Sequence, residues 1–308
     1  MKTLTEFKMN IRAMLSTSPP ELDHVLPGLL AGSVGVIAAP GGTGKSMLLT
    51  QLALAIAAGG PFVGGALEGC SVSAPRKVVT FFAEETTAVM HHRLHGSVRQ
   101  LFADMQADNR DDRLTIVDRL AENLFMYPLG GEGRLVSMSG DAMRGDGFRE
   151  LLACCEGARL IVGDPLRRFH DGDENDSGRM TNVIEGFQSL AKRTGAAVLL
   201  AHHTNRNSTL SGTGDQASAS RGSSALTDGV RWQANLSSLS DSFAETLGIT
   251  KEERPQFIRL DISKANYVQS PSPVVLRRVP DTGALVRWSN EKSGSAGAGC
   301  GRTSRKQR

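Results

Sequence analysis

The sequence is poor in the features that mark secreted, membrane-spanning or zinc-binding proteins. It has four cysteines among 308 residues, and none of them stands in a C-x-x-C or Cys/His ligand spacing. No stretch approaches the roughly 18 apolar residues that a membrane-spanning helix needs, and the amino terminus lacks the apolar core of a signal peptide. We therefore expect a soluble, cytoplasmic protein with reduced cysteines.

Excess charge of one sign is also scarce. The formal net charge is +3 at pH 7, which is too small to indicate a nucleic-acid partner by itself. Binding to a polyanion would have to come from the local placement of basic residues. The length suffices for one large α/β domain with a substantial core, and no second domain is evident.

The strongest pattern is the stretch VGVIAAPGGTGKS at residues 34–46, which precedes a helix-prone segment ending near Ala58. It matches the phosphate-loop pattern G-x-x-x-x-G-K-[ST], except that Ala39 replaces the first glycine. In such a loop, backbone N–H groups surround phosphate oxygens, Lys45 reaches the β- and γ-phosphates, and Ser46 binds Mg²⁺. The sequence therefore predicts a site for ATP and Mg²⁺, and the residues that form it are Gly41, Gly42, Thr43, Gly44, Lys45 and Ser46.

Polar side chains follow three other apolar runs that have the composition of buried parallel strands. These runs are 77–83, which leads to Glu84 and Glu85, 159–163, which leads to Asp164, and 196–201, which leads to His202 and His203. Ligands of open α/β sheets bind at the carboxyl ends of the strands. We therefore expect these side chains beside the phosphate loop, with the strands of Glu84 and Asp164 adjacent to the loop strand.

Each strand end has a predicted role. Asp164 is expected to hold the Mg²⁺ shell, and Glu84 to orient or deprotonate an attacking water. A histidine at the end of the third strand can hydrogen-bond a γ-phosphate. For Glu84 and Glu85 the alternative is a favourable charge at the start of the following helix.

The remaining segments complete a predicted α/β domain. Residues 3–15 have the apolar spacing of an amphipathic helix, and the Ser18-Pro19-Pro20 break separates it from the domain, so it packs on its own subunit or on a neighbour. Residues 205–220 are almost entirely small and polar, which indicates a flexible loop. The runs FIRLDISKANY, PVVLRRV and LVRW alternate like the antiparallel edge of a mostly parallel sheet. The basic tail from residue 293 is expected to be disordered.

Taken in order, the segments PGGTGKS, VVTFFAEE, RLIVGDPLRRFH, LLAHHTN, QASASRGSSALTDGVRWQ and ISKANY resemble the RecA-fold ATPases. The similarity is greater to the RepA-type hexameric replicative DNA helicases of broad-host-range, IncQ-like plasmids. It covers roughly residues 20–270. The resemblance implies an arm at 1–18 that docks on the neighbouring subunit and a RecA-like ATPase domain at 19–290. The remaining residues, 291–308, are expected from their composition to form the disordered basic tail.

The resemblance also implies functional residues and partners. Glu84 matches the catalytic glutamate, and His203 the γ-phosphate sensor. Arg221 matches the arginine finger that reaches the neighbour's ATP, with Lys264 as a second cation from the same neighbour. The expected partners are single-stranded DNA, contacted by loop 205–220, further copies in a hexameric ring, and plasmid initiator and primase proteins. The loop departs from the family in having a single basic residue, Arg206.

A ring would explain why the predicted site has no arginine from its own chain, because the finger would come from the next subunit. A surface arginine paired with Asp228 is the alternative for Arg221. Two other RecA-fold classes stay open. A recombinase would form a filament with the same interface, and a KaiC-like regulatory ATPase would form rings without unwinding DNA.

Overall fold

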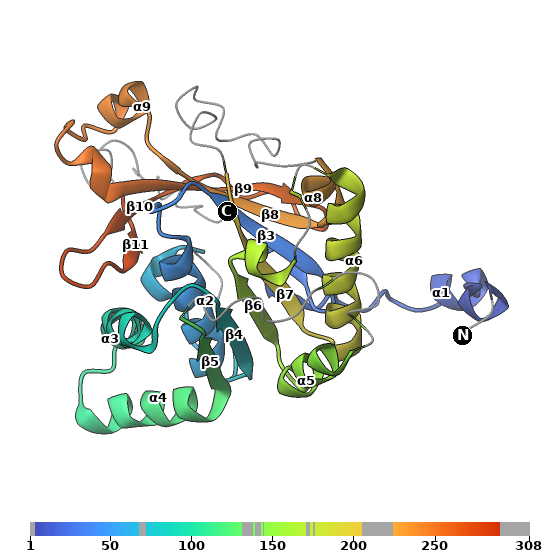
Figure 1. Ribbon diagram of the computed structural model, residues 1–308. Coiled ribbons are helices and arrows are strands. Elements are labelled where there is room, and N and C mark those ends of the chain that lie inside the picture. Colours follow the sequence, from blue (N-terminus) through green and yellow to red (C-terminus); the bar gives the residue numbers. More distant parts are fainter. Residues whose placement is uncertain are drawn as a thin grey trace, which may run out of the picture.

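The computed structural model describes residues 4–67, 72–130, 138, 143, 145–170, 173–174, 176–204 and 224–289. A sheet of nine strands, ordered β11-β10-β9-β8-β3-β7-β6-β4-β5, forms the centre of the molecule (Figure 1). Its strands are β3 (Val34–Ala39), β4 (Val78–Phe82), β5 (Leu124–Pro128), β6 (Leu160–Asp164), β7 (Ala197–His203), β8 (Trp232–Ser238), β9 (Phe257–Ala265), β10 (Val274–Arg278) and β11 (Leu285–Arg287). A separate antiparallel pair, β1 (His24–Leu26) with β2 (Leu29–Leu30), precedes the sheet.

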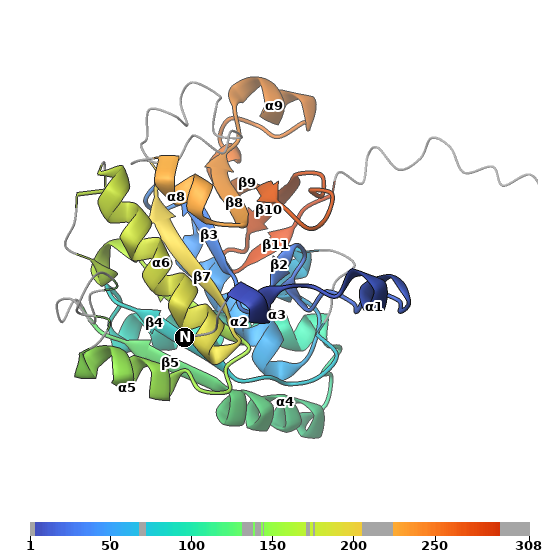
Figure 2. The same ribbon diagram turned by 90° about the vertical axis from the view of Figure 1, so that its right-hand side faces the viewer.

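Helices cover both faces of the sheet. One face carries α2 (Lys45–Ala58), α3 (Thr87–Asp104) and α4 (Arg110–Asn123), and the other carries α5 (Asp146–Cys154), α6 (Ser177–Thr194) and α8 (Ser224–Gly229) (Figures 1 and 2). The short helix α9 (Asp241–Thr246) lies between β8 and β9 in the chain. Among the helices that the structure describes, none is long and apolar enough to cross a bilayer.

Alternation along the parallel strands directs side chains into two large cores, one on each face of the sheet, and a third, smaller core surrounds α9. In β3, Ile37 and Ala39 pack into the core under α2, whereas Val34, Val36 and Ala38 pack into the core under α6. All six residues of β3 are buried. Burial on both faces explains why the sequence of this strand is a continuous apolar run.

The predicted fold class is confirmed. Strands β3 to β8 pair in parallel, and β8, β9, β10 and β11 pair antiparallel in turn. Strand β8 was missing from the prediction. In β8 the buried polar residues Gln233 and Asn235 alternate with the apolar residues Trp232, Ala234 and Leu236. The sequence therefore lacks the continuous apolar run by which the other buried strands were predicted.

The predicted strand neighbours are wrong. The phosphate-loop strand β3 pairs with β7 and β8, and β6 pairs with β7 and β4. Neither the strand of Glu84 nor that of Asp164 is therefore adjacent to β3. Strand order depends on the long crossovers between strands, which leave no mark in the local pattern of residues.

The amino-terminal segment is not one helix. It forms a 3-10 turn, η1 (Leu4–Phe7), and a single helical turn, α1 (Ile11–Leu15), that begins where the side chain of Asn10 accepts a hydrogen bond from Ala13 N. The segment projects from the body (Figures 1 and 2). Its apolar side chains are exposed, with Phe7 65% and Leu15 83% accessible.

Candidate nucleotide site

The loop between β3 and α2 requires glycine at two positions. Gly42 and Gly44 have φ angles of 77° and 110°, in the left-handed region that side chains with a Cβ rarely adopt. Gly44 is the N-cap of the 14-residue helix α2, and no side chain caps the helix. The backbone N–H groups of the first turn can therefore donate hydrogen bonds to a bound anion. This geometry fits the phosphate loop that the sequence predicts.

The side chain of Lys45 lies inside this loop. Its ammonium donates hydrogen bonds to the carbonyl oxygens of Ala39 and Pro40, with N–O distances of 2.8 and 3.1 Å. Burial lowers the pKa of Lys45, and the charges of Asp164 and Glu84 oppose this shift. The ammonium is thus a buried charge with two negative groups nearby, a setting that also suits it to a phosphate.

His203 contacts this ammonium from the end of β7. Its Nδ1 lies 3.3 Å from Lys45 Nζ. Burial is the main cause that lowers the pKa of His203, and the positive charge of Lys45 lowers it further. At pH 7 the imidazole is therefore neutral, and its Nδ1 can accept a hydrogen bond from the ammonium. The neighbouring His202 is buried.

Asp164 ends β6 next to the first turn of α2. The hydroxyl of Ser46 lies beside the carboxylate of Asp164 and favours its ionised form. Within the described part of the chain, the buried Oδ2 atom of Asp164 has no hydrogen-bond partner. Burial raises the pKa of Asp164, and Ser46 and the charge of Lys45 act against this rise. A carboxylate oxygen left open beside a serine hydroxyl fits Mg²⁺, which takes one or two protein ligands along with phosphates and waters.

The two glutamates after β4 each pair with an arginine. Glu85 Oε1 lies 2.6 Å from Arg93, whose side chain is 14% exposed and lies over the ring of Phe82. Glu84 Oε1 lies 3.1 Å from Nε of Arg168, and both of these side chains are more exposed. Glu84 is therefore the less constrained carboxylate of the two. Arg93 holds the carboxylate of Glu85 in place, which leaves Glu84 as the carboxylate that can more easily turn towards a water molecule.

A cavity of about 340 Å³ connects these groups. Its lining residues are Gly42, Gly44, Lys45, Ser46, Met47, Glu84, Glu85, Arg93, Asp164, Pro165, His203 and Arg278. The expectation of a site without arginines from its own chain is wrong, because Arg93 and Arg278 line the cavity and Arg168 contacts Glu84. Arg168 is close to Asp164 in sequence and could have been anticipated. Arg278 could not, because it arrives from β10 near the end of the chain.

Among the described residues that the sequence predicts for the site, Gly41, Thr43 and Lys264 do not line this cavity. Lys264 lies in β9, and its Nζ donates a hydrogen bond to the carbonyl oxygen of Thr227 at 2.7 Å. Lys264 is absent from the residues that line the cavity. Arg221, the predicted loop 205–220 and the predicted tail 291–308 lie outside the described residues.

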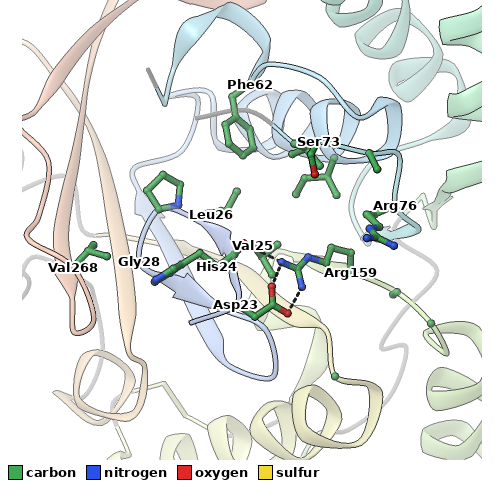
Figure 3. A pocket seen from close by; sticks show the side chains of 17 residues that line it. Asp23, His24, Val25, Leu26, Gly28, Phe62, Ser73, Arg76, Arg159 and Val268 are labelled. Atoms are coloured by element: carbon green, nitrogen blue, oxygen red, sulfur yellow. Dashed lines mark hydrogen bonds and ion pairs between the residues drawn. The ribbon is translucent and has the colours of Figure 1, made fainter. Parts of the chain in front are cut away.

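A larger cavity, of about 910 Å³, lies at the opposite, amino-terminal edge of the sheet (Figure 3). It is lined by Arg76 and Arg159, which precede β4 and β6. The guanidinium of Arg159 binds both carboxylate oxygens of Asp23, at 2.5 and 2.6 Å, and the carbonyl oxygen of His24. Arg159 thus anchors the start of β1. This cavity lacks the phosphate loop and is not the nucleotide site.

Comparison with known proteins identifies the family. A family model described as an AAA domain matches residues 3–209. The chain belongs to the AAA domain family. Among solved structures, this AAA domain protein is similar to an ATPase domain with a TM-score of 0.57 and 14% identity, over 93% of this chain and 99% of that one.

A second similar structure is a DnaB-like replicative helicase, solved to examine its interactions with primase. Its TM-score is 0.53 and its identity 15%, over 83% of this chain and 57% of the helicase. At these identities the likeness shows the fold. The RecA-like architecture that the sequence predicts is therefore confirmed.

Proposed function

We propose that this AAA domain protein is an ATP-dependent DNA helicase that works as a hexameric ring during plasmid replication. One observation carries the proposal: Lys45, Ser46, Asp164 and Glu84 come from three separate strand ends and line a single cavity at the start of α2. This is the set of groups that phosphoryl transfer from ATP requires. The likeness to a replicative helicase supports the choice of DNA unwinding as the work that hydrolysis drives.

The proposed reaction is attack of water on the γ-phosphate of ATP. Lys45 exchanges its contacts with the loop carbonyls for phosphate oxygens, and the N–H groups of the loop hold the phosphates in place. Ser46 and Asp164 would hold Mg²⁺, which would supply positive charge to the phosphates. Glu84 accepts the proton of the attacking water. His203, neutral and bonded to Lys45, can contact the γ-phosphate and change its position when that phosphate leaves.

Glu84→Gln should leave ATP binding intact and reduce hydrolysis by about 10²- to 10⁴-fold, because an amide of the same shape cannot accept the proton. Nucleotide affinity from calorimetry and steady-state turnover measure the two effects separately. Glu85→Gln is the matched control and should retain most of its activity, since Glu85 is held by Arg93. Normal turnover in Glu84→Gln together with a dead Glu85→Gln would transfer the role of general base to Glu85.

The amino-terminal arm is proposed to dock on the neighbouring subunit. Its apolar side chains are exposed, and the Ser18-Pro19-Pro20 break leaves the segment free to reach a neighbouring subunit. Deleting residues 1–18 should shift the protein towards monomers in sedimentation velocity. Substituting the exposed Leu15 and Phe7 by serine tests the same contact with the chain length kept. Stable rings from both proteins would place the arm on its own domain.

The ring is proposed to bind single-stranded DNA through the loop at 205–220, with primase and a plasmid initiator as further partners. Because this loop has a single basic residue, Arg206, its binding to the DNA backbone should be weak, and the contribution of the loop should depend little on salt. Lys264 and Arg221 are proposed to reach the ATP of the next subunit. Lys264 would then exchange its contact with Thr227 for a phosphate.

Electron microscopy with nucleotide and single-stranded DNA, together with a strand-displacement assay, tests the function. Rings that enclose DNA and displace a strand only with hydrolysable ATP are expected. Helical filaments would favour the recombinase class, and rings that form without DNA and never unwind a duplex would favour a KaiC-like regulator.

A further inference from the structure

The C-terminal hairpin of β10 and β11 forms one wall of the nucleotide cavity. Gln51 of α2 holds it, because its Nε2 donates to Leu285 O at 2.8 Å and its Oε1 accepts from Leu285 N at 2.9 Å. The turn of the hairpin packs on the same region, since a Cβ at Gly283 would lie 3.3 Å from the side chain of Met47. A segment remote in sequence is thus fixed against the first turns of α2.

This hairpin brings Arg278 to the phosphate loop. Its Nη2 lies 3.4 Å from the carbonyl oxygens of Gly42 and Thr43. It also limits the space beside Gly44, where a Cβ would lie 3.4 Å from the same nitrogen. Both contacts to the loop are long for hydrogen bonds. A guanidinium has five N–H donors, so most of its capacity is available to another acceptor.

The charge of Arg278 has no carboxylate partner in the part of the chain that the structure describes, whereas Arg93 and Arg168 each have one. The next residue back in the strand, Arg277, points to the other face, where it lies over the ring of Phe257. Arg278 is therefore a cation held at the cavity wall with its charge uncompensated there. A phosphate is the acceptor for which guanidinium geometry is best suited.

We propose that Arg278 binds the α-phosphate of the nucleotide, and that the hairpin forms the end of the site where the nucleoside lies. Glu84, Asp164 and His203 mark the γ-phosphate end. Arg278 instead approaches over Gly44, on a hairpin that contacts Met47, the residue that follows the Mg²⁺-binding Ser46. The first turn of a phosphate-loop helix lies beside the α- and β-phosphates. This assignment rests on the proposed nucleotide site and adds a binding residue from the same chain.

Three substitutions of Arg278 separate the effect of its positive charge from the effect of its hydrogen bonds to the phosphate loop. Arg278→Lys keeps the charge. Arg278→Gln keeps an N–H donor for the carbonyl oxygens of the loop but has no charge, and Arg278→Ala removes both. Arg277→Ala is the matched control, one residue away on the opposite face. Calorimetric titration of the full chain with ADP and with the non-hydrolysable analogue AMPPNP, both in Mg²⁺, gives the affinities, and circular dichroism reports folding.

Both Arg278→Ala and Arg278→Gln should lower the binding affinity for nucleotide about 10- to 100-fold. In each variant the factor should be the same for ADP and AMPPNP, because the two ligands share the α-phosphate. Arg278→Lys should stay within about fivefold of wild type, and Arg277→Ala should equal it. The loss in Arg278→Gln should shrink as salt screens the charge of the wild-type protein.

Normal affinity in Arg278→Gln would overturn the proposal and reduce Arg278 to a support of the loop. A loss confined to AMPPNP would overturn it by moving the contact to the γ-phosphate. Lys45→Ala is run in parallel. If wild-type protein and every variant fail to bind nucleotide, the proposed site itself is wrong. If Lys45→Ala loses binding and Arg278→Gln does not, only the assignment of Arg278 fails.

Discussion

Replacing Lys45 by alanine should abolish ATP hydrolysis and leave the fold intact. The ammonium is the buried cation in the loop, and in the proposed site it stabilises charge on the β- and γ-phosphates during transfer. Losing a preorganised charge of this kind typically costs at least about 10²- to 10³-fold in rate. Steady-state turnover measured alongside circular dichroism is the test.

Stability should change little in Lys45→Ala. The two carbonyl groups that the ammonium contacts lie at the loop beside the cavity, where water can replace it. Lys192→Ala removes a lysine from the exposed surface of α6 and should behave as wild type. Turnover in Lys45→Ala above about a tenth of wild type, with normal circular dichroism, would contradict the proposed role of the loop.

The parts of this site that sequence could predict are those encoded by local pattern. The loop from Ala39 to Ser46 has a fixed spacing with a mechanical cause, and buried strands that end in acids or histidines are visible as apolar runs. From these two patterns we expected Asp164 to lie beside the phosphate loop, and it does, although the predicted strand order was wrong. The carboxyl ends of all parallel strands meet at one edge, so the edge is predictable when the order is not.

The features that could not be predicted from the sequence depend on contacts between segments that are distant along the chain. Strand β8 pairs with β3 through a run whose buried Gln233 and Asn235 break the apolar pattern. Arg278 reaches the loop because β10 follows β9 along the antiparallel edge and Gln51 fixes the hairpin. Neither effect has a local signature. The prediction of one helix at the amino terminus was wrong for a different reason. Asn10 caps a new helical turn, so the apolar residues are divided between the two short elements η1 and α1.

The second large effect is expected at Arg221. In the proposed ring this arginine reaches the ATP of the next subunit, where a guanidinium spreads positive charge over the transferring phosphoryl group. An arginine finger typically contributes about 10³- to 10⁵-fold in rate. Arg221→Ala should therefore bind nucleotide and assemble normally while hydrolysing ATP very slowly. Arg93 and Arg168 do not replace it, because they are paired with glutamates, and Arg278 is proposed to bind the α-phosphate rather than the transferring group.

Mixing two inactive proteins tests whether Arg221 acts between subunits. In a mixed ring, the intact phosphate loop of an Arg221→Ala subunit can meet the intact Arg221 of a Lys45→Ala neighbour, so hydrolysis should return although each parent is inactive. Activity should rise and fall with the mixing ratio, with a maximum at intermediate ratios. Mixed assembly is verified by labelling the two proteins with different fluorophores and measuring energy transfer. Rings that mix but recover no activity at any ratio would show that Arg221 does not complete the neighbour's site, and would favour its pairing with Asp228 on the surface.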